Sequence, residues 1–197
     1  MALGVISYSQ GMARWEPDAT GRLVVAALEL FAERGYDETT VAEIAERAGL
    51  TKRTFFRYFS DKREVLFPGG GEFQQVIVDA VAGAPDSATA LQAVSAGLEA
   101  TGAFFQDRRE FAIKRHQVIA ANPELQERER MKLASLAEGI AGALRARGVG
   151  EPAATLAAEA GVTVFHVAFA RWVDPENQEP LVALIRDALA ELRSVAA

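Results

Sequence analysis

The sequence predicts an all-helical protein in which a small N-terminal helical unit is followed by a larger helical body. Half of the 197 residues are hydrophobic, which is enough to bury a sizeable core. Apolar residues recur at helical spacing along most of the chain, and long alternating β-patterns are absent. Residues 39–59 form two short predicted helices joined by a tight turn, with basic residues opposite an aromatic face. We expect about nine helices in total.

The chain divides by composition into three segments. Residues 1–17 lack both the basic start and the long apolar middle of a signal peptide, so we expect a flexible leader. Residues 18–66 are expected to form a three-helix domain that contains a helix-turn-helix. Residues 67–197 form the helical body, because Pro68 and the three glycines after it are poor helix interior and should break the chain there.

The first domain opens with a helix over about 18–34, which ends before Gly35. Its apolar face is formed by Leu23, Ala26, Ala27, Leu30 and Phe31. The second helix begins at a capping box, Thr40-x-x-Glu43, and ends at Gly49, where glycine adopts the left-handed conformation at little cost. Thr51 can cap the third helix.

The third helix separates its aromatic side chains from its basic ones. At 100° per residue, Phe55 and Phe59 face the core, whereas Arg57 points in nearly the opposite direction. Phe56 and Tyr58 lie on the two sides between these faces. Ser60 and Asp61 then cap a further predicted helix that opens with Lys62 and stops at the Pro-Gly break.

Six helices are predicted in the body. They cover residues 72–82, 87–104, 107–121, 123–147, 152–173 and 180–194. The helix at 152–173 is apolar on all sides from Gly161 to Ala170, so we expect one side to face the core and the other a second subunit. With the helix at 180–194 it would form a four-helix interface in a homodimer.

The charge is distributed unevenly. The whole chain has a net charge of −6, yet residues 47–63 contain six basic residues and one acidic residue, a local +5. A local basic patch on an acidic body suits a focal contact with DNA. On a helix such a patch can also be a solvated face with no partner.

Enzyme and metal classes find little support in this sequence. There is no cysteine, and the two histidines stand 50 residues apart, which is not a metal-ligand spacing. No nucleophile elbow is present, and Gly69-Gly70-Gly71 lacks the residues of a phosphate-binding loop. We therefore expect no enzymatic activity, metal or cofactor. No uninterrupted apolar run reaches about 18 residues, so we expect no membrane span and a cytoplasmic location.

Residues 20–66 resemble the signature of the tetracycline-repressor (TetR) family. The motifs that carry this resemblance, in order and without gaps, are Arg22 to Phe31, Gly35-Tyr36, Thr39-Thr40-Val41, Ile44-Ala45, Ala48-Gly49, Phe55 to Phe59 and Lys62-x-x-x-Leu66. The rest of the chain resembles the family only in the number and length of its helices.

The resemblance implies a homodimeric transcriptional regulator, usually a repressor, that binds palindromic operator DNA. It also implies a small-molecule pocket in the C-terminal domain and dimerisation through the last two helices. The DNA contacts that it implies are Thr40, Thr51, Lys52, Arg53, Thr54, Arg57, Tyr58 and Lys62. Phe56 stands where the family commonly has tyrosine, and only Arg14 and Arg22 represent the basic run that often precedes the first helix. Both departures should weaken non-specific affinity.

The basic and hydroxyl residues suggest different roles on DNA. Arg53 and Arg57 lie one turn apart, and arginine can bind guanine in the major groove through two hydrogen bonds. Lys52 and Lys62, with the hydroxyls of Thr40 and Tyr58, are better suited to phosphates, which position a protein without specifying sequence. Phe56 fits either the core or a contact with the DNA backbone.

The candidate ligand-binding residues are less specific. They are Phe73, Phe104, Phe105, Arg115, His116, Phe165, His166 and Phe169. Aromatic residues at helical spacing are more often core than pocket, and His166 suits a core or interface position. Arg115 and His116 could hold an acidic ligand.

The function predicted from these observations is a repressor that a small molecule releases from its operator. Two alternatives stay open at this point. One is a DNA-binding regulator without a ligand, and the other is a helical small-molecule-binding protein whose DNA-binding head is impaired.

Overall fold

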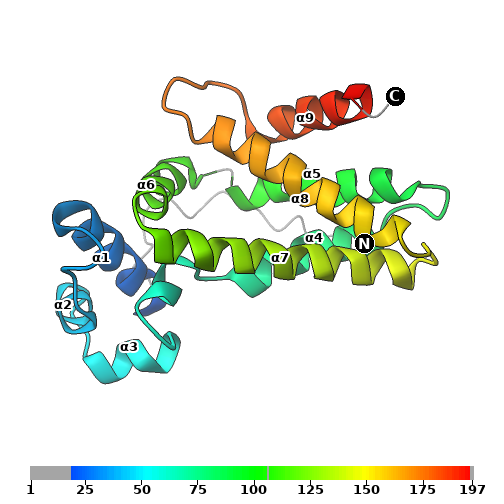
Figure 1. The fold of residues 1–197 in the computed structure, drawn as a ribbon. Helices are drawn as coiled ribbons and strands as arrows, with labels where there is room; N and C mark the ends of the chain where they lie inside the picture. Colours follow the sequence, from blue (N-terminus) through cyan, green and yellow to red (C-terminus); the bar gives the residue numbers. More distant parts are fainter. Residues whose placement is uncertain (1–18, 106, 196–197) are drawn as a thin grey trace, which may run out of the picture. The chain divides into compact units, whose positions relative to one another are not determined.

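The computed structural model describes residues 19–105 and 107–195, in which every regular element is a helix (Figure 1). The predicted all-α class is confirmed, whereas the predicted leader lies outside the described residues. The elements are α1 (Ala19–Arg34), α2 (Val41–Arg47), α3 (Lys52–Tyr58), the 3-10 turn η1 (Arg63–Leu66), α4 (Gly70–Ala82), α5 (Ala90–Phe105), α6 (Arg109–Ala120), α7 (Pro123–Ala146), α8 (Ala153–Trp172) and α9 (Leu181–Val195). Two compact units divide between Pro68 and Gly69, two residues after the predicted boundary.

The first unit is organised around α1, which packs against α2 and η1. Leu23 and Ala27 of α1 are fully buried, and Leu30 is nearly so. The buried Thr39 follows this helix and donates its hydroxyl hydrogen to the Gly35 carbonyl at 2.8 Å. The side chain thereby satisfies a carbonyl that the end of α1 leaves without a helical partner.

The predicted caps of α2 and α3 are confirmed. Thr40 Oγ1 accepts the Glu43 amide hydrogen at 3.2 Å, and Glu43 Oε2 accepts the Thr40 amide hydrogen at 2.8 Å. Gly49 then turns the chain with a φ of 67°, and Thr51 caps α3 by accepting the Thr54 amide hydrogen at 3.1 Å. Local side-chain chemistry therefore defines both ends of this tight turn.

The helix predicted to open at Lys62 is corrected to a single 3-10 turn, η1. Asp61 Oδ1 accepts the amide hydrogens of Arg63 and Glu64 at 2.8 and 3.3 Å, so the turn is capped as an N-terminus would be. It stops after one turn because Pro68 disfavours a helical residue before it and Gly69 adopts a left-handed φ of 66°. The helical pattern resumes in α4.

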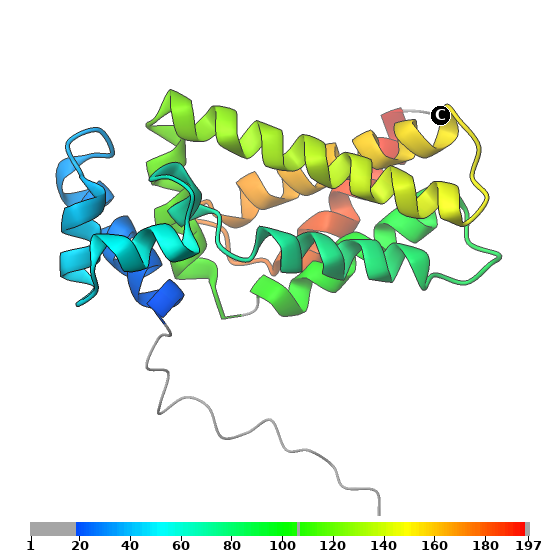
Figure 2. The same cartoon turned by 90° about the horizontal axis from the view of Figure 1, so that it is seen from below.

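The second unit is a bundle in which α8 packs against α5, α7 and α9, and α4 packs against α5 and α7 (Figures 1 and 2). Close packing depends on glycine at two crossings. A Cβ at Gly161 of α8 would overlap Val94 of α5, and a Cβ at Gly97 would lie 2.7 Å from Val81 of α4. These helices approach as closely as they do because neither glycine has a side chain.

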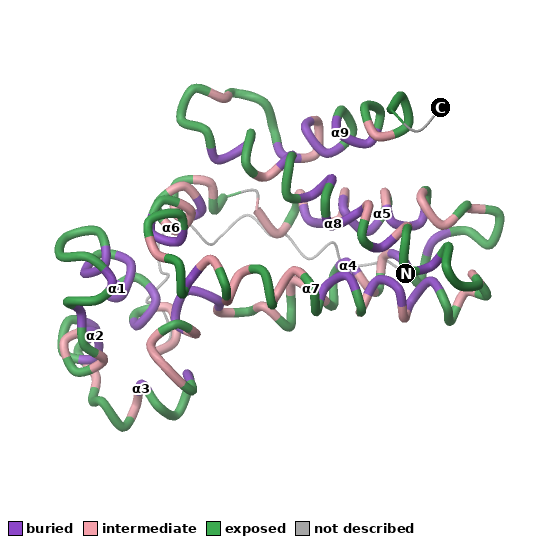
Figure 3. The backbone as a smooth tube through the Cα atoms, viewed as in Figure 1, coloured by how far each residue is buried: buried purple, intermediate pink, exposed green. Residues whose placement is uncertain are grey.

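Buried and exposed residues recur turn by turn along α8 (Figure 3). Ala158 and Phe165 are buried, whereas Leu156 is 64% exposed and Val167 is 48% exposed. We predicted that α8 is buried on both sides. Within this single chain one side is buried in the core and the other side is exposed. By length and composition α8 could cross a membrane, and a third of that apolar stretch is buried in the bundle.

The apolar face of α9 is buried within its own unit. Leu184 and Ile185 are fully inaccessible, while Arg186 and Asp187 are exposed. Arg186 pairs with Glu99 of α5. The apolar face of α9 thus contributes to the core of this unit, and the outward side of the helix is charged.

Candidate functional site

The recognition candidate α3 is rooted in the first unit by two phenylalanines. Phe55 is fully buried and Phe59 is 6% exposed, and their ring centroids lie 5.4 Å apart. The predicted core role of both residues is confirmed. Because a helix of only seven residues is marginal by itself, α3 depends on this aromatic anchor and on the Thr51 cap for its stability.

The opposite side of α3 carries cations and two aromatic rings. Lys52, Arg53 and Arg57 are exposed, together with Phe56 at 48% and Tyr58 at 43%. Phe56 is thereby placed outside the core, which removes one of its two sequence interpretations. We call these five residues the α3 basic face.

Contacts within the α3 basic face are weak and local. The Arg57 guanidinium lies 4.8 Å from the centre of the Tyr58 ring and donates a hydrogen bond to the Tyr58 hydroxyl at 3.0 Å. The Lys52 ammonium lies 6.0 Å from the Phe56 ring centre. The Arg53 side chain makes no ion pair or hydrogen bond with any residue in the described ranges. These cations are therefore free to meet an anionic partner.

Two other cations of the basic stretch are neutralised inside the unit. Arg47 bridges to Glu29 and Glu33 of α1 at 3.4 and 2.9 Å, and its hydrogen bond lowers the pKa of Glu33. Arg63 pairs with Asp61 at 3.0 Å, and this hydrogen bond likewise lowers the pKa of Asp61. The local positive charge is thus concentrated on α3.

Lys62 has an internal role that its position in the motif does not reveal. Its ammonium donates hydrogen bonds to the carbonyls of Tyr36 and Thr39 at 2.7 and 3.0 Å and lies 4.0 Å from the Tyr36 ring centre. Two of its three hydrogens are used in this way. Lys62 therefore holds the loop that leads into α2, and the predicted phosphate contact stays a prediction.

The threonine hydroxyls are also engaged in caps. Thr40 Oγ1 donates to Glu43 at 2.8 Å, and Thr51 Oγ1 lies 2.9 Å from Thr54 Oγ1. The backbone hydrogen bond from Thr40 is the main cause of a lowered pKa at Glu43, which also binds Arg34 at 2.9 Å. Because Thr40 and Thr51 cap helix starts, they orient the α3 basic face even without touching a ligand.

Most of the predicted ligand-binding aromatics meet in the second unit. Neighbouring rings lie 5.1 to 6.3 Å apart in a cluster formed by Phe73 of α4, Phe104 and Phe105 of α5, and Phe165, Phe169 and Trp172 of α8. Such ring-to-ring distances are those of packed aromatic pairs. We call this group the aromatic cluster.

The three polar candidates for ligand binding have different surroundings. Arg115 pairs with Glu129 of α7 at 3.0 Å, and burial lowers the pKa of Arg115 while Glu129 raises it. His116 approaches the Phe169 ring edge with centroids 6.4 Å apart. His166 is exposed on α8 and does not join the aromatic cluster. Across the described ranges, no group of three or more carboxylate and histidine side chains could hold a metal ion.

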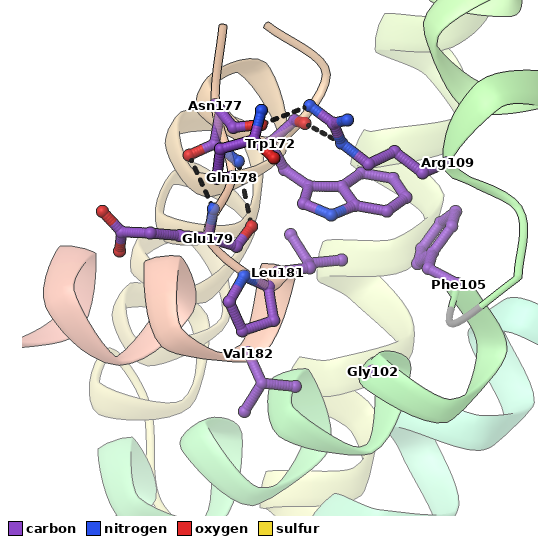
Figure 4. A pocket seen from close by; sticks show the side chains of 10 residues that line it. Gly102, Phe105, Arg109, Trp172, Asn177, Gln178, Glu179, Leu181 and Val182 are labelled. Atoms are coloured by element: carbon purple, nitrogen blue, oxygen red, sulfur yellow. Dashed lines mark hydrogen bonds between the residues drawn. The ribbon is translucent and has the colours of Figure 1, made fainter. Parts of the chain in front are cut away.

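A cavity of about 550 Å³ lies at the edge of the aromatic cluster (Figure 4). It is lined by Gly102, Phe105, Arg109, Trp172, Asn177, Gln178, Glu179, Pro180, Leu181 and Val182. Only Phe105 was among the predicted ligand-binding residues. The loop between α8 and α9 has no hydrophobic periodicity and supplies most of the polar lining, so sequence reasoning had no signal for it.

Comparison with known proteins identifies the family. The profile "Bacterial regulatory proteins, tetR family" matches residues 23–67, and the profile "MftR C-terminal domain" matches residues 88–197, which is more than half of the chain. The chain belongs to the TetR family of transcriptional regulators. The family that the N-terminal motifs resembled is thereby confirmed.

Named relatives share parts of this chain. It is similar to the regulator TcmR of Streptomyces glaucescens, with 38% identity over 40% of this chain and 35% of the relative. It is similar also to MftR of Mycobacterium tuberculosis, named for mycofactocin biosynthesis, with 35% identity over 51% of this chain and 50% of the relative. The chain therefore spans half or less of the curated relatives that it matches here.

Solved structures share the fold across most of the chain. FadR of Bacillus subtilis, solved in complex with stearoyl-CoA, aligns with 22% identity and a TM-score of 0.61 over 87% of this chain and 96% of that one. A TetR-family protein from Syntrophomonas wolfei aligns with 16% identity and a TM-score of 0.63 over 90% and 94% of the two chains. At such identities the likeness shows the fold alone.

Proposed function

We propose that this TetR-family chain works as a homodimeric repressor that binds operator DNA and is released by a small molecule. The observation that carries the DNA-binding part is the α3 basic face, with three unpaired or weakly engaged cations opposite a buried aromatic anchor. An α-helix fits the major groove, where the base edges differ from one another. Binding to bacterial chromosomal DNA places the protein in the cytoplasm.

Within the α3 basic face we assign base contacts to Arg53 and Arg57. Lys52 and the Tyr58 hydroxyl are assigned to phosphates, which position the helix. Thr40, Thr51 and Thr54 act mainly through the caps that orient α3. Lys62 supports the loop before α2 and has one ammonium hydrogen left for a phosphate.

The proposed dimer interface uses the outer side of α8. Between Ala153 and Ala170 the only formally charged residue is Glu159, and Leu156 and Val167 remain exposed in the single chain. An exposed apolar helix face of this kind suits a second copy of the same chain. Because the outer side of α9 is charged, we expect α9 to contribute ion pairs and hydrogen bonds to that interface. Two recognition helices would then bind half-sites about 34 Å apart.

The proposed effector acts by binding two dimer conformations with different affinities, since only such a difference can change DNA affinity. FadR of Bacillus subtilis is a relative in fold that was solved with stearoyl-CoA. For this chain the effector stays unidentified, and the aromatic cluster and the neighbouring cavity are its candidate sites. A ligand-independent regulator, or a small-molecule-binding protein with an impaired head, are the competing proposals.

The function can be tested by recovering and sequencing genomic DNA bound to the full chain, followed by binding to the enriched sequence at increasing salt. We expect one palindromic motif and an affinity that falls steeply with salt, because phosphate contacts release counterions. Absence of an enriched motif, together with binding that does not depend on salt, would contradict the proposal and favour the impaired head.

A further inference from the structure

Arg109 ties the start of α6 to the loop between α8 and α9. Its Nε donates to the Trp172 carbonyl at 3.1 Å, and its Nη2 donates to the carbonyls of Asp174 and Asn177, both at 2.8 Å. The same guanidinium lines the 550 Å³ cavity, where it stands at the polar rim beside the Trp172 ring (Figure 4). One cation therefore both shapes the loop and faces the cavity.

The charge of Arg109 is solvated by carbonyls but is not matched by an acid. Within the described part of the chain, Arg109 forms no ion pair, and its Nη1 donates no hydrogen bond. Among the described residues that line the cavity, Glu179 is the one acid, and its carboxylate points away from Arg109 (Figure 4). The cavity thus contains a guanidinium with donor capacity left over, and no described residue supplies its counterion.

The rest of the lining is largely apolar on the inner side. Phe105, Trp172 and Leu181 form a hydrophobic floor, and Phe105 and Trp172 also belong to the aromatic cluster, with ring centroids 5.5 Å apart. A volume of about 550 Å³ is in the range of sites that hold small organic ligands. A ligand with an apolar body could cover this floor while its single polar group reached Arg109 at the rim.

We propose that this cavity binds an amphipathic monoanion, in which a carboxylate on an apolar body pairs with Arg109. A carboxylate suits this position because it can pair with the guanidinium in a charged hydrogen bond and neutralise it, which the neutral carbonyl partners of Arg109 cannot do. The assignment deepens the proposed function by naming the chemistry of the effector, and it rests on that function only for its regulatory meaning. Binding itself can be measured without DNA.

Arg147 provides a matched control within the same unit. It makes the same kind of clamp, donating from Nη1 to the Ala82 and Ala84 carbonyls and from Nη2 to the Pro85 carbonyl at 2.7 Å. Arg147 does not line the cavity. A substitution there removes a similar set of backbone contacts and an equal charge while leaving the cavity unaltered.

The test uses the full chain with Trp15→Phe, so that Trp172 in the cavity floor is the sole tryptophan. The probes are 4-phenylbutyrate, 4-phenylbutanol and 4-phenylbutylamine, which share one apolar body and differ in charge. We expect saturable Trp172 quenching by the acid, with an affinity about tenfold or more above that of the alcohol, and no saturation by the amine. No saturation by the acid at millimolar concentration, or equal affinities for acid and alcohol, would overturn the proposal.

The variants assign the charge to one side chain. Arg109→Gln should abolish the preference for the acid, whereas Arg147→Gln should retain it. If thermal melting shows that Arg109→Gln is unfolded, Arg109→Lys keeps a cation without the planar fork and should show a reduced but measurable preference for the acid. An undiminished preference in the folded Arg109 variant, or an equal loss in Arg147→Gln, would refute the assignment. Because no DNA is present, this result is separate from the DNA-binding test.

Discussion

Helices α3 and α8 are built alike on their inner sides and differently on their outer sides. Each buries aromatic rings, which are Phe55 and the C-cap residue Phe59 for α3, and Phe165 and Trp172 for α8. Outward, α3 presents three cations in seven residues, whereas α8 presents mainly alanine, threonine and exposed aliphatic side chains over five turns. The aromatic inner side secures a helix to its own unit, and the outer side determines what kind of partner it can accept.

The physical reason lies in what each outer surface gains on contact. Cations on α3 gain from phosphates and from guanine acceptors, and that gain falls with salt. The exposed aliphatic residues of α8 gain from removal of apolar area from water, which depends little on salt. Substitutions on the two helices should therefore separate DNA affinity from subunit association.

The largest effect is expected on the α8 side. Val167→Glu would place a carboxylate in the proposed apolar interface, where an unpaired buried charge costs several kcal/mol, about 3–5. We expect the dimer to dissociate to monomer in sedimentation or light-scattering measurements. Met131→Glu on α7, where the side chain is 55% exposed, should leave the dimer intact. A dimeric Val167→Glu protein would move the interface away from this face.

The substitution Arg57→Ala tests whether the α3 basic face binds DNA. Loss of one base-contacting arginine should weaken operator binding by about 1–3 kcal/mol, roughly fivefold to 150-fold, while leaving the dimer intact. Arg130→Ala is a control of equal charge, because Arg130 lies on α7 with its side chain 66% exposed. Equal operator affinity for wild type and Arg57→Ala, measured by fluorescence anisotropy, would show that α3 is not the reader.

The inner side of α8 can be probed through its glycine. Gly161→Ala should destabilise the protein by about 1–2 kcal/mol in denaturant unfolding, because the new Cβ would overlap Val94. Gly142→Ala in α7 is the matched control, since its Cβ would lie 3.8 Å from the nearest Arg145 atom. Alanine is the better helix former, so this control should be neutral or stabilised by up to about 1 kcal/mol. Equal stability of the two variants would contradict the close crossing of α5 and α8.

The smallest effect concerns the ring that departs from the family pattern. Phe56→Tyr would add a hydroxyl at an exposed position beside Lys52, where it could donate to a phosphate. We expect affinity for unrelated duplex DNA to rise by about tenfold, since one hydrogen bond to a charged group contributes about 1.5 kcal/mol or more. An unchanged affinity for non-operator DNA would place Phe56 away from the backbone.

Helix boundaries could be predicted closely because their signals are local. The helix expected at 123–147 is α7, Pro123–Ala146, since proline suits the first helical turn and Gly148 takes a left-handed φ of 86° after it. The capping box at Thr40 is likewise a contact between residues three apart. The basic face opposite Phe55 followed from helical periodicity alone.

The cavity could not be predicted because its walls are distant in sequence and irregular in conformation. Arg109 meets the carbonyls of Trp172 and Asn177, which lie more than 60 residues away. Backbone carbonyls carry no sequence signal, since every residue has one. The same holds for Lys62, whose partners are the carbonyls of Tyr36 and Thr39.

The sequence by itself determined the all-α class, the order and ends of most helices, and the cations and aromatic anchor of α3, because periodicity and caps act over a few residues. Tertiary structure decided which charges remain available and where empty space lies. Arg47 and Arg63 are neutralised by carboxylates, and the apolar face of α9 is buried in the core of its own unit. Arg109 reaches the loop that follows α8. These outcomes depend on which distant groups meet, and a linear pattern does not record that.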